Sequence, residues 1–463
     1  MPLPQVEQQL LIPPIPASLP SQVDQTLDSC PRFRILLVGN SGVGKSSLVR
    51  HMFNVDPEKI DVADGRAGDA DIEHEYESSD NPRFVLHDSK GFEAGSATNW
   101  DKVERFLRRC QAYPDLSRRV HAIWFCLLTP RQGARLLEAG DEQLLKVAIE
   151  LKIPIIGILT KYDLLINQFL RKKPKVDNPE EAASKSFDSS VEKLQRVWRE
   201  LSSAGSPMAC VRMSISDNTD RKATREMLTI LTNVTRAELR HVEGELWIPW
   251  AAAQQINARQ KVELSIHEGV KKYWKDLGQS VVFKDQTVID CLRRIHEDIL
   301  TVWNFRDPHR ILVSPEFFSQ MIGLVAPLID DQAKQTSSLG DKISNMKDLI
   351  ELITGVGGTA LALPLSAVTL GFVVLKFIYS KYQRYDWAAR VLATYIVNLV
   401  LVLHEIFMNI LPSDPPRSLS LSIAADALAS LKSDLRTKPL GNISPTPEGI
   451  TQVIKARLRF QDQ

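Results

Sequence analysis

The chain has 463 residues, of which 57 are Lys or Arg and 56 are Asp or Glu. A chain of this length exceeds one ordinary hydrophobic core, so we expect two or three domains. The near balance of charge argues against nucleic-acid binding through net charge, and we expect no nucleic-acid partner. The five cysteines are scattered without a C-x-x-C pair, which argues against a zinc site or a disulfide framework and favours a reducing, cytoplasmic location.

Residues 1–31 are predicted to be a disordered arm. Prolines are dense in the first 20 residues and lie among polar side chains. Because proline removes a backbone donor and favours extended chain, this composition does not predict a packed element. A ligand for a proline-binding domain is the alternative to a plain linker, and the linker is favoured.

Residues 34–50 hold the motif on which the functional prediction depends. An apolar run ends at a turn that fits the pattern G-x-x-x-x-G-K-[ST], and a helical pattern comes directly after it. The turn glycines would let successive N–H groups face a phosphate. Lys45 is expected to reach the β- and γ-phosphates of a nucleotide, and Ser46 to ligate Mg²⁺, beside the positive end of the helix. The candidate binding residues are Gly39, Asn40, Ser41, Gly42, Val43, Gly44, Lys45, Ser46 and Ser47.

A second motif, D-x-x-G, comes at the end of the predicted strand at residues 83–88. Asp88 can hold Mg²⁺ through a water molecule, and the N–H of Gly91 can contact a γ-phosphate. This short pattern is common by chance, and its value comes from its place one strand after a phosphate loop. Ser46 and Asp88 are therefore the predicted metal ligands.

A third motif, Thr160-Lys161-Tyr-Asp163, closes the apolar strand predicted at residues 153–159. A carboxylate at Asp163 can accept hydrogen bonds from N1–H and the N2 amino group of guanine, while the stem of Lys161 lies along the base. Adenine offers no such pair of donors, so the motif predicts a preference for GTP and GDP. Ser214 and Ile215, near the end of the last predicted strand, are candidates for a backbone contact to the guanine oxygen.

Short apolar runs alternate with helical patterns through residues 32–240, which predicts parallel strands joined by crossover helices. The predicted strands are residues 34–38, 72–76 (an edge strand), 83–88, 120–128, 153–159 and 209–215. The predicted helices lie around residues 99–112, 138–151, 181–203 and 221–240. We therefore predict an α/β P-loop NTPase fold whose mostly parallel sheet has one antiparallel edge strand.

In this order and at these strand ends, the motifs resemble the HSR1/MMR1-type G domain of the Ras-like, translation-factor-related GTPases. The whole chain also resembles uncharacterised fungal G-domain proteins, through residues 87–93, 271–274, 295–299 and 302–305. The resemblance implies binding of a guanine nucleotide. It implies neither a cellular role nor an effector or activating protein.

Two departures from that family bear on hydrolysis. Such domains usually carry a threonine between the phosphate loop and D-x-x-G, and residues 48–87 contain none. The acidic segment 61–71 is the predicted first switch, without a nameable sensing residue. The position after Gly91, which often carries a glutamine that orients water, is Phe92. Because a phenyl ring cannot hydrogen-bond water, we expect slow intrinsic hydrolysis.

Helical periodicity dominates beyond residue 241, which predicts an all-α domain over residues 241–435 and a flexible tail over 436–463. Residues 352–375 contain no charged side chain and are long enough to cross a bilayer, and a second apolar helix lies beyond them. The alternatives are a buried helical hairpin over residues 352–411 and a membrane anchor, with the hairpin slightly favoured.

We therefore predict a GTP-binding switch with slow GTPase activity, whose helical domain reads the nucleotide through residues 55–71 and 88–100. One alternative is a GTPase anchored in a membrane by residues 352–375. The other is a nucleotide-binding module that does not hydrolyse GTP.

Overall fold

A computed structural model describes residues 27–458, with gaps. The residues not described within that span are 28, 41, 56–71, 89–96, 131–135, 138, 172–176, 203–206, 216–220, 241, 243–245, 267–287, 326–384, 412–417, 438–439, 441–442 and 445. The predictions for the first switch, for Ser41, Gly91 and Phe92, and for residues 352–375 fall outside the described residues.

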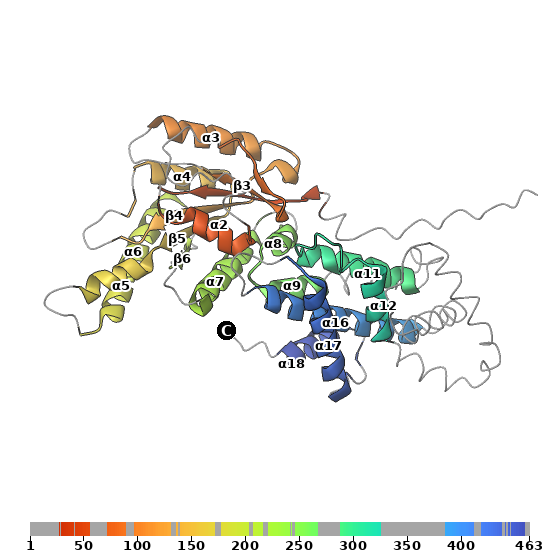
Figure 1. Cartoon of the computed structure of the whole chain (residues 1–463). Helices are drawn as coiled ribbons and strands as arrows, with labels where there is room; N and C mark the ends of the chain where they lie inside the picture. Colours follow the sequence, from red (N-terminus) through yellow and green to blue (C-terminus); the bar gives the residue numbers. More distant parts are fainter. Residues whose placement is uncertain are drawn as a thin grey trace, which may run out of the picture.

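A six-stranded sheet forms the first half of the chain, in the order β2-β3-β1-β4-β5-β6 (Figure 1). Neighbouring strands are parallel except for β2, which pairs antiparallel with β3 at the edge. The strands are β1 (Phe33–Val38), β2 (Tyr76–Ser78), β3 (Asn81–Asp88), β4 (Ala122–Leu128), β5 (Ile155–Thr160) and β6 (Ala209–Arg212). This sheet confirms the predicted α/β fold with one antiparallel edge strand.

Helices cover both faces of the sheet. They are α2 (Lys45–Phe53), α3 (Ala97–Gln111), α4 (Ala139–Glu150), α5 (Tyr162–Leu170), α6 (Pro179–Leu201) and α7 (Arg221–Leu239). Successive strand residues point to opposite faces, so Phe33, Ile35 and Leu37 pack with α2 and α7, whereas Leu36 and Val38 pack with α3 and α4. Figure 1 shows α3 and α4 on one side of the sheet and α2 and α7 on the other.

The short helix α8 (Trp247–Ala253) joins the sheet region to the helical region. The ring of Trp250 is fully buried and lies 5.1 Å from the ring of Phe33 and 6.0 Å from that of Trp124, measured between centroids. By its sequence pattern Trp250 belongs to the helical region, but its ring covers the sheet instead. The predicted boundary at residue 240 therefore precedes an element that packs on the core of the sheet region.

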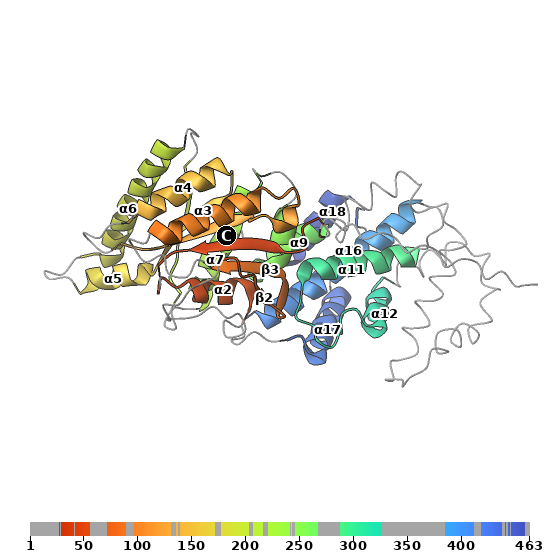
Figure 2. The ribbon, with the colours of Figure 1, turned by 90° about the horizontal axis from the view of Figure 1, so that it is seen from above.

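The helical region is built around α16 (Tyr385–Ile410). The other helices described there are α9 (Ala258–Ile266), α11 (Val288–Trp303), α12 (Pro315–Gly323), α17 (Leu421–Thr437) and α18 (Pro447–Leu458). All five contact α16, and Figure 2 shows them grouped at the side of the molecule away from α3–α6. This arrangement confirms a helical region after the α/β region.

One helix within the described residues, Arg390–Ile410, is long and apolar enough to cross a membrane. In the structure, 83% of its most apolar window is buried. Length and composition alone do not separate a membrane span from the central helix of a soluble core. The contacts of α16 with the surrounding helices account for its apolar composition without a bilayer.

Three predictions at the ends of elements need correction. Leu27 and Cys30 belong to buried cores, so these two residues of the predicted arm 1–31 are packed. The predicted flexible tail contains α18, because Ile450 and Ile454 are fully buried against the helical core. The edge strand begins at Tyr76 rather than at residue 72, since the charged residues of 72–75 form side-chain contacts instead of a ladder.

Candidate nucleotide-binding site

The three predicted motifs meet at one edge of the sheet. Strands β1, β3, β5 and β6 all run in the same direction, so the loops at their carboxyl ends emerge at the same edge. Leu37 of β1 pairs with Asp88 of β3, which puts that carboxylate beside the start of the phosphate loop. Loops at the carboxyl ends of parallel strands are where ligands bind in folds of this class.

The phosphate loop is fixed by close packing at Gly39 and by an unusual backbone at Gly44. Gly39 has a φ of 152°, and a Cβ built on it would lie 2.3 Å from the carbonyl oxygen of Cys126 on β4. Gly44 has a φ of 98°, in the left-handed region, and directly precedes α2. No described atom lies within 4 Å of a Cβ built on Gly44, so its surroundings leave room for a phosphate group.

Lys45 lies in the first turn of α2, and its ammonium group folds over the loop. Nζ donates to the carbonyl oxygens of Gly39 at 2.8 Å and of Asn40 at 3.3 Å. The side chain is 9% exposed. Anchored at the loop mouth and adjacent to the positive end of α2, this cation can neutralise phosphate charge.

The other loop residues occupy the positions that a phosphate site requires. Val43 is buried and its N–H donates to the carbonyl of Asn40 at 3.4 Å, whereas Ser46 and Ser47 are half-buried in the first turn of α2. Asp88 is 2% exposed at the end of β3. A serine hydroxyl and a carboxylate are hard oxygen donors of the kind that Mg²⁺ prefers, so Ser46 and Asp88 fit the predicted metal.

The motif predicted to contact the base begins α5, a helix that the sequence pattern did not predict. Lys161 adopts a left-handed backbone with φ of 55° and turns the chain from β5 into α5. The hydroxyl of Thr160 donates to the carbonyl of Leu127 on β4 at 3.1 Å. Asp163 is therefore held in the first turn of α5, half-buried at the same edge as the phosphate loop.

Ser214, a candidate for a backbone contact to the guanine oxygen, contacts Asp163 and α7 in the structure. The hydroxyl oxygen of Ser214 accepts a hydrogen bond from the backbone N–H of Asp163 at 2.9 Å. The backbone N–H of Ser214 donates to Sδ of Met227 on α7 at 3.3 Å. The loop after β6 thus positions the start of α5, and Ile215 remains the described candidate in this loop for a contact to the guanine oxygen.

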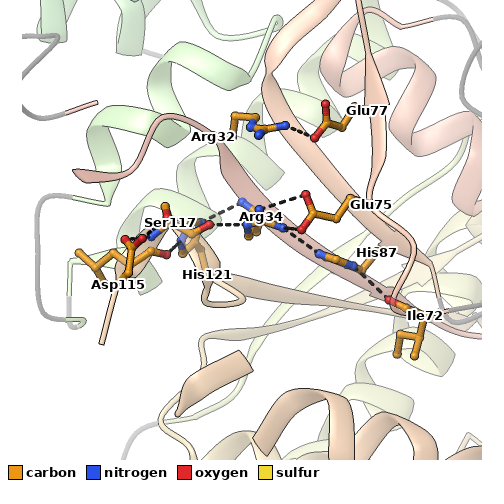
Figure 3. Close-up of polar contacts among 10 residues, drawn as sticks. Arg32, Arg34, Ile72, Glu75, Glu77, His87, Asp115, Ser117 and His121 are labelled. Carbon is orange, nitrogen blue, oxygen red and sulfur yellow. Dashed lines mark hydrogen bonds and ion pairs between the residues drawn. The ribbon is translucent and has the colours of Figure 1, made fainter. Parts of the chain in front are cut away.

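A polar cluster around the buried Arg34, which sequence reasoning missed, links β1 to β3 (Figure 3). Arg34 of β1 is 8% exposed and contacts both carboxylate oxygens of Glu75, at 2.7 and 3.1 Å. Its guanidinium also donates to Nε2 of His87 at 3.3 Å, and Nδ1–H of His87 donates to the carbonyl of Ile72 at 3.1 Å. The segment on the C-terminal side of the predicted first switch is thereby tied to the residue that precedes Asp88.

The glutamates of this segment each pair with a different arginine. Glu73 and Glu75 lie before β2 and form ion pairs, whereas Glu77 forms an ion pair and also pairs with Val85 of β3. The pairs are Glu73–Arg109, Glu75–Arg34 and Glu77–Arg32. Burial raises the pKa of Glu75, but the hydrogen bond and the charge of Arg34 together lower it by more than burial raises it. The net shift is therefore downward.

Two histidines in the cluster are neutral. His121 accepts from the backbone N–H of Arg34 at Nδ1, 2.8 Å away, and therefore carries its proton on Nε2, which donates to the carbonyl of Leu116 at 2.8 Å. Burial lowers the pKa of His87 and of His121 to about 4. Neutral rings avoid placing a second positive charge next to Arg34.

Comparison with protein families agrees with this geometry. Residues 34–161, from β1 to the end of β5, match the family model described as 50S ribosome-binding GTPase. This match supports an HSR1/MMR1-type G domain over residues 34–161. The match ends before Asp163 and before the loop after β6, so those assignments depend on the motif and on the contacts of Asp163 with Ser214.

A second match covers residues 311–437 and is described as a domain of unknown function, DUF8505. It spans α12, α16 and α17 of the helical region. A comparison with curated proteins gave no match. The family matches thus support guanine-nucleotide binding by the G domain and assign no activity to the helical region.

Proposed function

We propose that the protein is a GTP-binding switch with slow GTPase activity, which signals through its helical region. The observation that carries the proposal is the convergence of three groups at one sheet edge. These are Lys45 over the phosphate loop, Asp88 at the end of β3, and Asp163 in the first turn of α5. A phosphate cradle, a metal-binding carboxylate and a carboxylate for the purine edge together suit a guanine nucleotide with Mg²⁺.

Slow turnover is inferred from the residues on either side of Asp88 in the chain. Phe92 stands where many G domains carry a water-orienting glutamine, and residues 48–87 lack a threonine to sense Mg²⁺ and the γ-phosphate. Positioning of the nucleophile and electrostatic stabilisation supply most of the rate enhancement in phosphoryl transfer. A G domain without those side chains binds nucleotide but hydrolyses it slowly unless a partner supplies a group.

The same two features favour a second candidate function, a guanine-nucleotide-binding module without turnover. Its nucleotide would then serve as a structural ligand that stabilises the folded chain by mass action. The two functions predict the same binding specificity and differ only in phosphate release.

Two measurements test the proposal. Titration with fluorescent GTP, GDP and ATP should give guanine affinities at least about 100-fold above that for ATP, which corresponds to about 2.7 kcal/mol. Equal affinities, or no binding, would contradict the proposal. An overnight single-turnover assay with Mg²⁺ should then release more phosphate than a Lys45→Ala control. Release equal to that control would favour the module without turnover.

A further inference from the structure

A buried polar junction joins the G domain to the helical region at the end of β3 opposite the nucleotide site. Asn81, the first residue of β3, is 1% exposed. Its Nδ2 donates to the carbonyl of Phe53, the last residue of α2, at 3.0 Å, and to that of Ala253, the last residue of α8, at 2.8 Å. Its Oδ1 accepts from Nδ2 of Asn304, the residue directly after α11, at 2.9 Å.

A fully buried lysine fixes the helix ends that surround Asn81. Nζ of Lys261 on α9 donates to the carbonyls of Ala252, Val302 and Trp303 at 2.9, 3.1 and 3.1 Å. These carbonyls belong to the last turns of α8 and α11, where helix dipoles place partial negative charge. Asn304 also donates to Ala252 at 3.3 Å. The ends of α8 and α11 are therefore held to each other and, through Asn304, to β3.

The turn between β2 and β3 is bonded to the helical region as well as to its own short hairpin. β2 has three residues, its register with β3 shifts between Glu77 and Ser78, and Pro82 has no N–H to donate. Arg306, in the helical region, forms an ion pair with Asp80 of the turn at 3.0 Å, and the Asp80 side chain is 4% exposed. The carbonyl of Arg306 accepts from the N–H of Leu419, next to α17, at 2.9 Å.

Both elements that meet in this junction have their other end at the nucleotide site. α2 starts at Lys45 on the phosphate loop, and its last carbonyl, that of Phe53, is bonded to Asn81. β3 starts at Asn81 and ends at Asp88. A change in how the nucleotide holds the phosphate loop or Asp88 is thus applied, through two rigid elements, to the same cluster of hydrogen bonds.

A cleft lies beside the junction, next to the β2–β3 hairpin. Its volume is about 840 Å³, and it separates the β2–β3 hairpin from the connection between α11 and α12. Residues on its two walls include Arg32, Ser79, Arg83, Thr301, Asp307 and Arg310. The hairpin contacts the helical region at the junction, and the cleft beside it leaves room for the hairpin to shift about the junction.

We propose that Asn304 and Arg306 are positioning residues for the nucleotide site, and that this junction carries the nucleotide state to the helical region. This inference depends on the proposed function, because it needs a bound guanine nucleotide. Coupling between two sites is reciprocal, so contacts made by the helical region hold β3 and α2 in the nucleotide-binding arrangement. The helical region then responds to the nucleotide state through its contacts with the start of β3, and not only through the loops at residues 55–71 and 88–100.

Nucleotide dissociation from the full-length protein tests the inference. Asn304→Ala and Arg306→Gln should each speed release of a fluorescent GDP by about 5- to 20-fold, while the preference for guanine over adenine nucleotides stays unchanged. Arg306 is half-exposed, so its variant should fold even if Asn304→Ala does not. Arg310→Asn is the matched control, because Arg310 lines the same cleft, is exposed, and has a left-handed backbone that asparagine tolerates.

The outcomes separate this inference from the proposed function. A wild-type protein that binds no guanine nucleotide overturns both. Normal guanine binding with release rates within twofold of wild type, in a folded Arg306→Gln variant, overturns the coupling alone. In the reciprocal measurement, GDP should slow amide hydrogen exchange at the end of α11, and Arg306→Gln should remove at least half of that protection. Identical exchange with and without GDP also overturns the coupling.

Discussion

The backbone of Asp163, the residue that we propose contacts the base, is held by Ser214. Its backbone N–H donates to the hydroxyl oxygen of Ser214, and the left-handed Lys161 directly precedes its helix, so the fold fixes the backbone that carries this carboxylate. A carboxylate accepts two hydrogen bonds from guanine, whereas an asparagine amide must donate one of its own. If Asp163 reads the base as we propose, its side chain sets base choice through this acceptor pattern.

Asp163→Asn should reduce affinity for GTP by about 100-fold and raise affinity for xanthosine triphosphate, because an unmet donor or acceptor in a closed site costs about 1–3 kcal/mol. Competition titrations with both nucleotides measure the change. Ser214→Ala is the control, since it loosens the start of α5 and should weaken binding of both nucleotides without changing their ratio. An unchanged preference in Asp163→Asn would show that this carboxylate does not contact the base.

Gly39 is held by β4, and this makes it more sensitive than its neighbours. In Gly39→Ala the new methyl group would lie 2.3 Å from the backbone oxygen of Cys126, which can move only with the strand. We expect a loss of about 2–4 kcal/mol in the free energy of unfolding, as for other overpacked or strained core positions. Gly42→Ala meets no described atom within 4 Å but has a φ of 73°, so it should lose only about 1 kcal/mol.

Urea unfolding without nucleotide measures both glycine variants. Equal losses would show that the conformation of the loop, rather than its contact with β4, requires glycine at position 39.

The sequence predicted the candidate site residues that belong to short motifs, in which a few neighbouring residues suffice for recognition. Lys45, Asp88 and Asp163 each stand in a short motif at the end of an apolar strand, so local pattern was enough to place them. The cluster around Arg34 has no such signal, since its partners Glu75, His87 and Ser117 lie 41, 53 and 83 residues away in the chain. The parallel pairing of β1 with β3 and β4, together with the antiparallel pairing of β2 with β3, brings them together.

At the level of elements, sequence patterns predict long periodic segments well and short or terminal ones poorly. The apolar face of α11 is evident from its spacing, whereas the pattern at α5 indicates a turn because the base-reading motif occupies its first residues. The prediction of a flexible tail is wrong for a related reason. Proline at 445 and 447 suggests a break, but Pro447 instead occupies the first position of α18, where a missing N–H has no cost.

α18 should contribute to the stability of the helical core rather than hang from it. Ile454 is fully buried, so Ile454→Ala removes buried methyl groups and should lower the free energy of unfolding by about 2–4 kcal/mol. Gln452→Ala, at an exposed position of the same helix, should change it by less than about 0.5 kcal/mol. Tryptophan fluorescence during urea unfolding measures the free energy of unfolding of both variants. Equal values for the two variants would show that α18 does not stabilise the helical core.

For the whole molecule, the predicted order of a G domain before a helical region agrees with the structure, but the point of division does not. Composition changes near residue 241, yet Trp250 covers the sheet, and Asn81 and Lys261 bond the two regions. A composition boundary reports where the pattern of apolar residues changes. Such a boundary does not show whether Trp250 packs in the core of the sheet region or of the helical region, because its indole ring could fill either core.

Both regions carry buried neutral histidines, and this predicts how the whole chain responds to acid. Burial lowers the pKa of His87 and His121 in the G domain, and of His296 in the helical region, from 6.5 to about 4. The unfolded chain therefore binds more protons between these values, so stability is fully present above pH 6.5 and falls as the pH decreases toward 4.

At pH 5 each of these histidines should cost about 2 kcal/mol relative to pH 7.5, and urea unfolding at several pH values measures the sum. His296→Gln should flatten the pH dependence, because it removes a ring that is buried between Leu312 and Tyr395. If the free energy of unfolding is constant between pH 7.5 and 5, these rings are already protonated or accessible to water in the folded chain, and the neutral histidines of the Arg34 cluster would have to be abandoned.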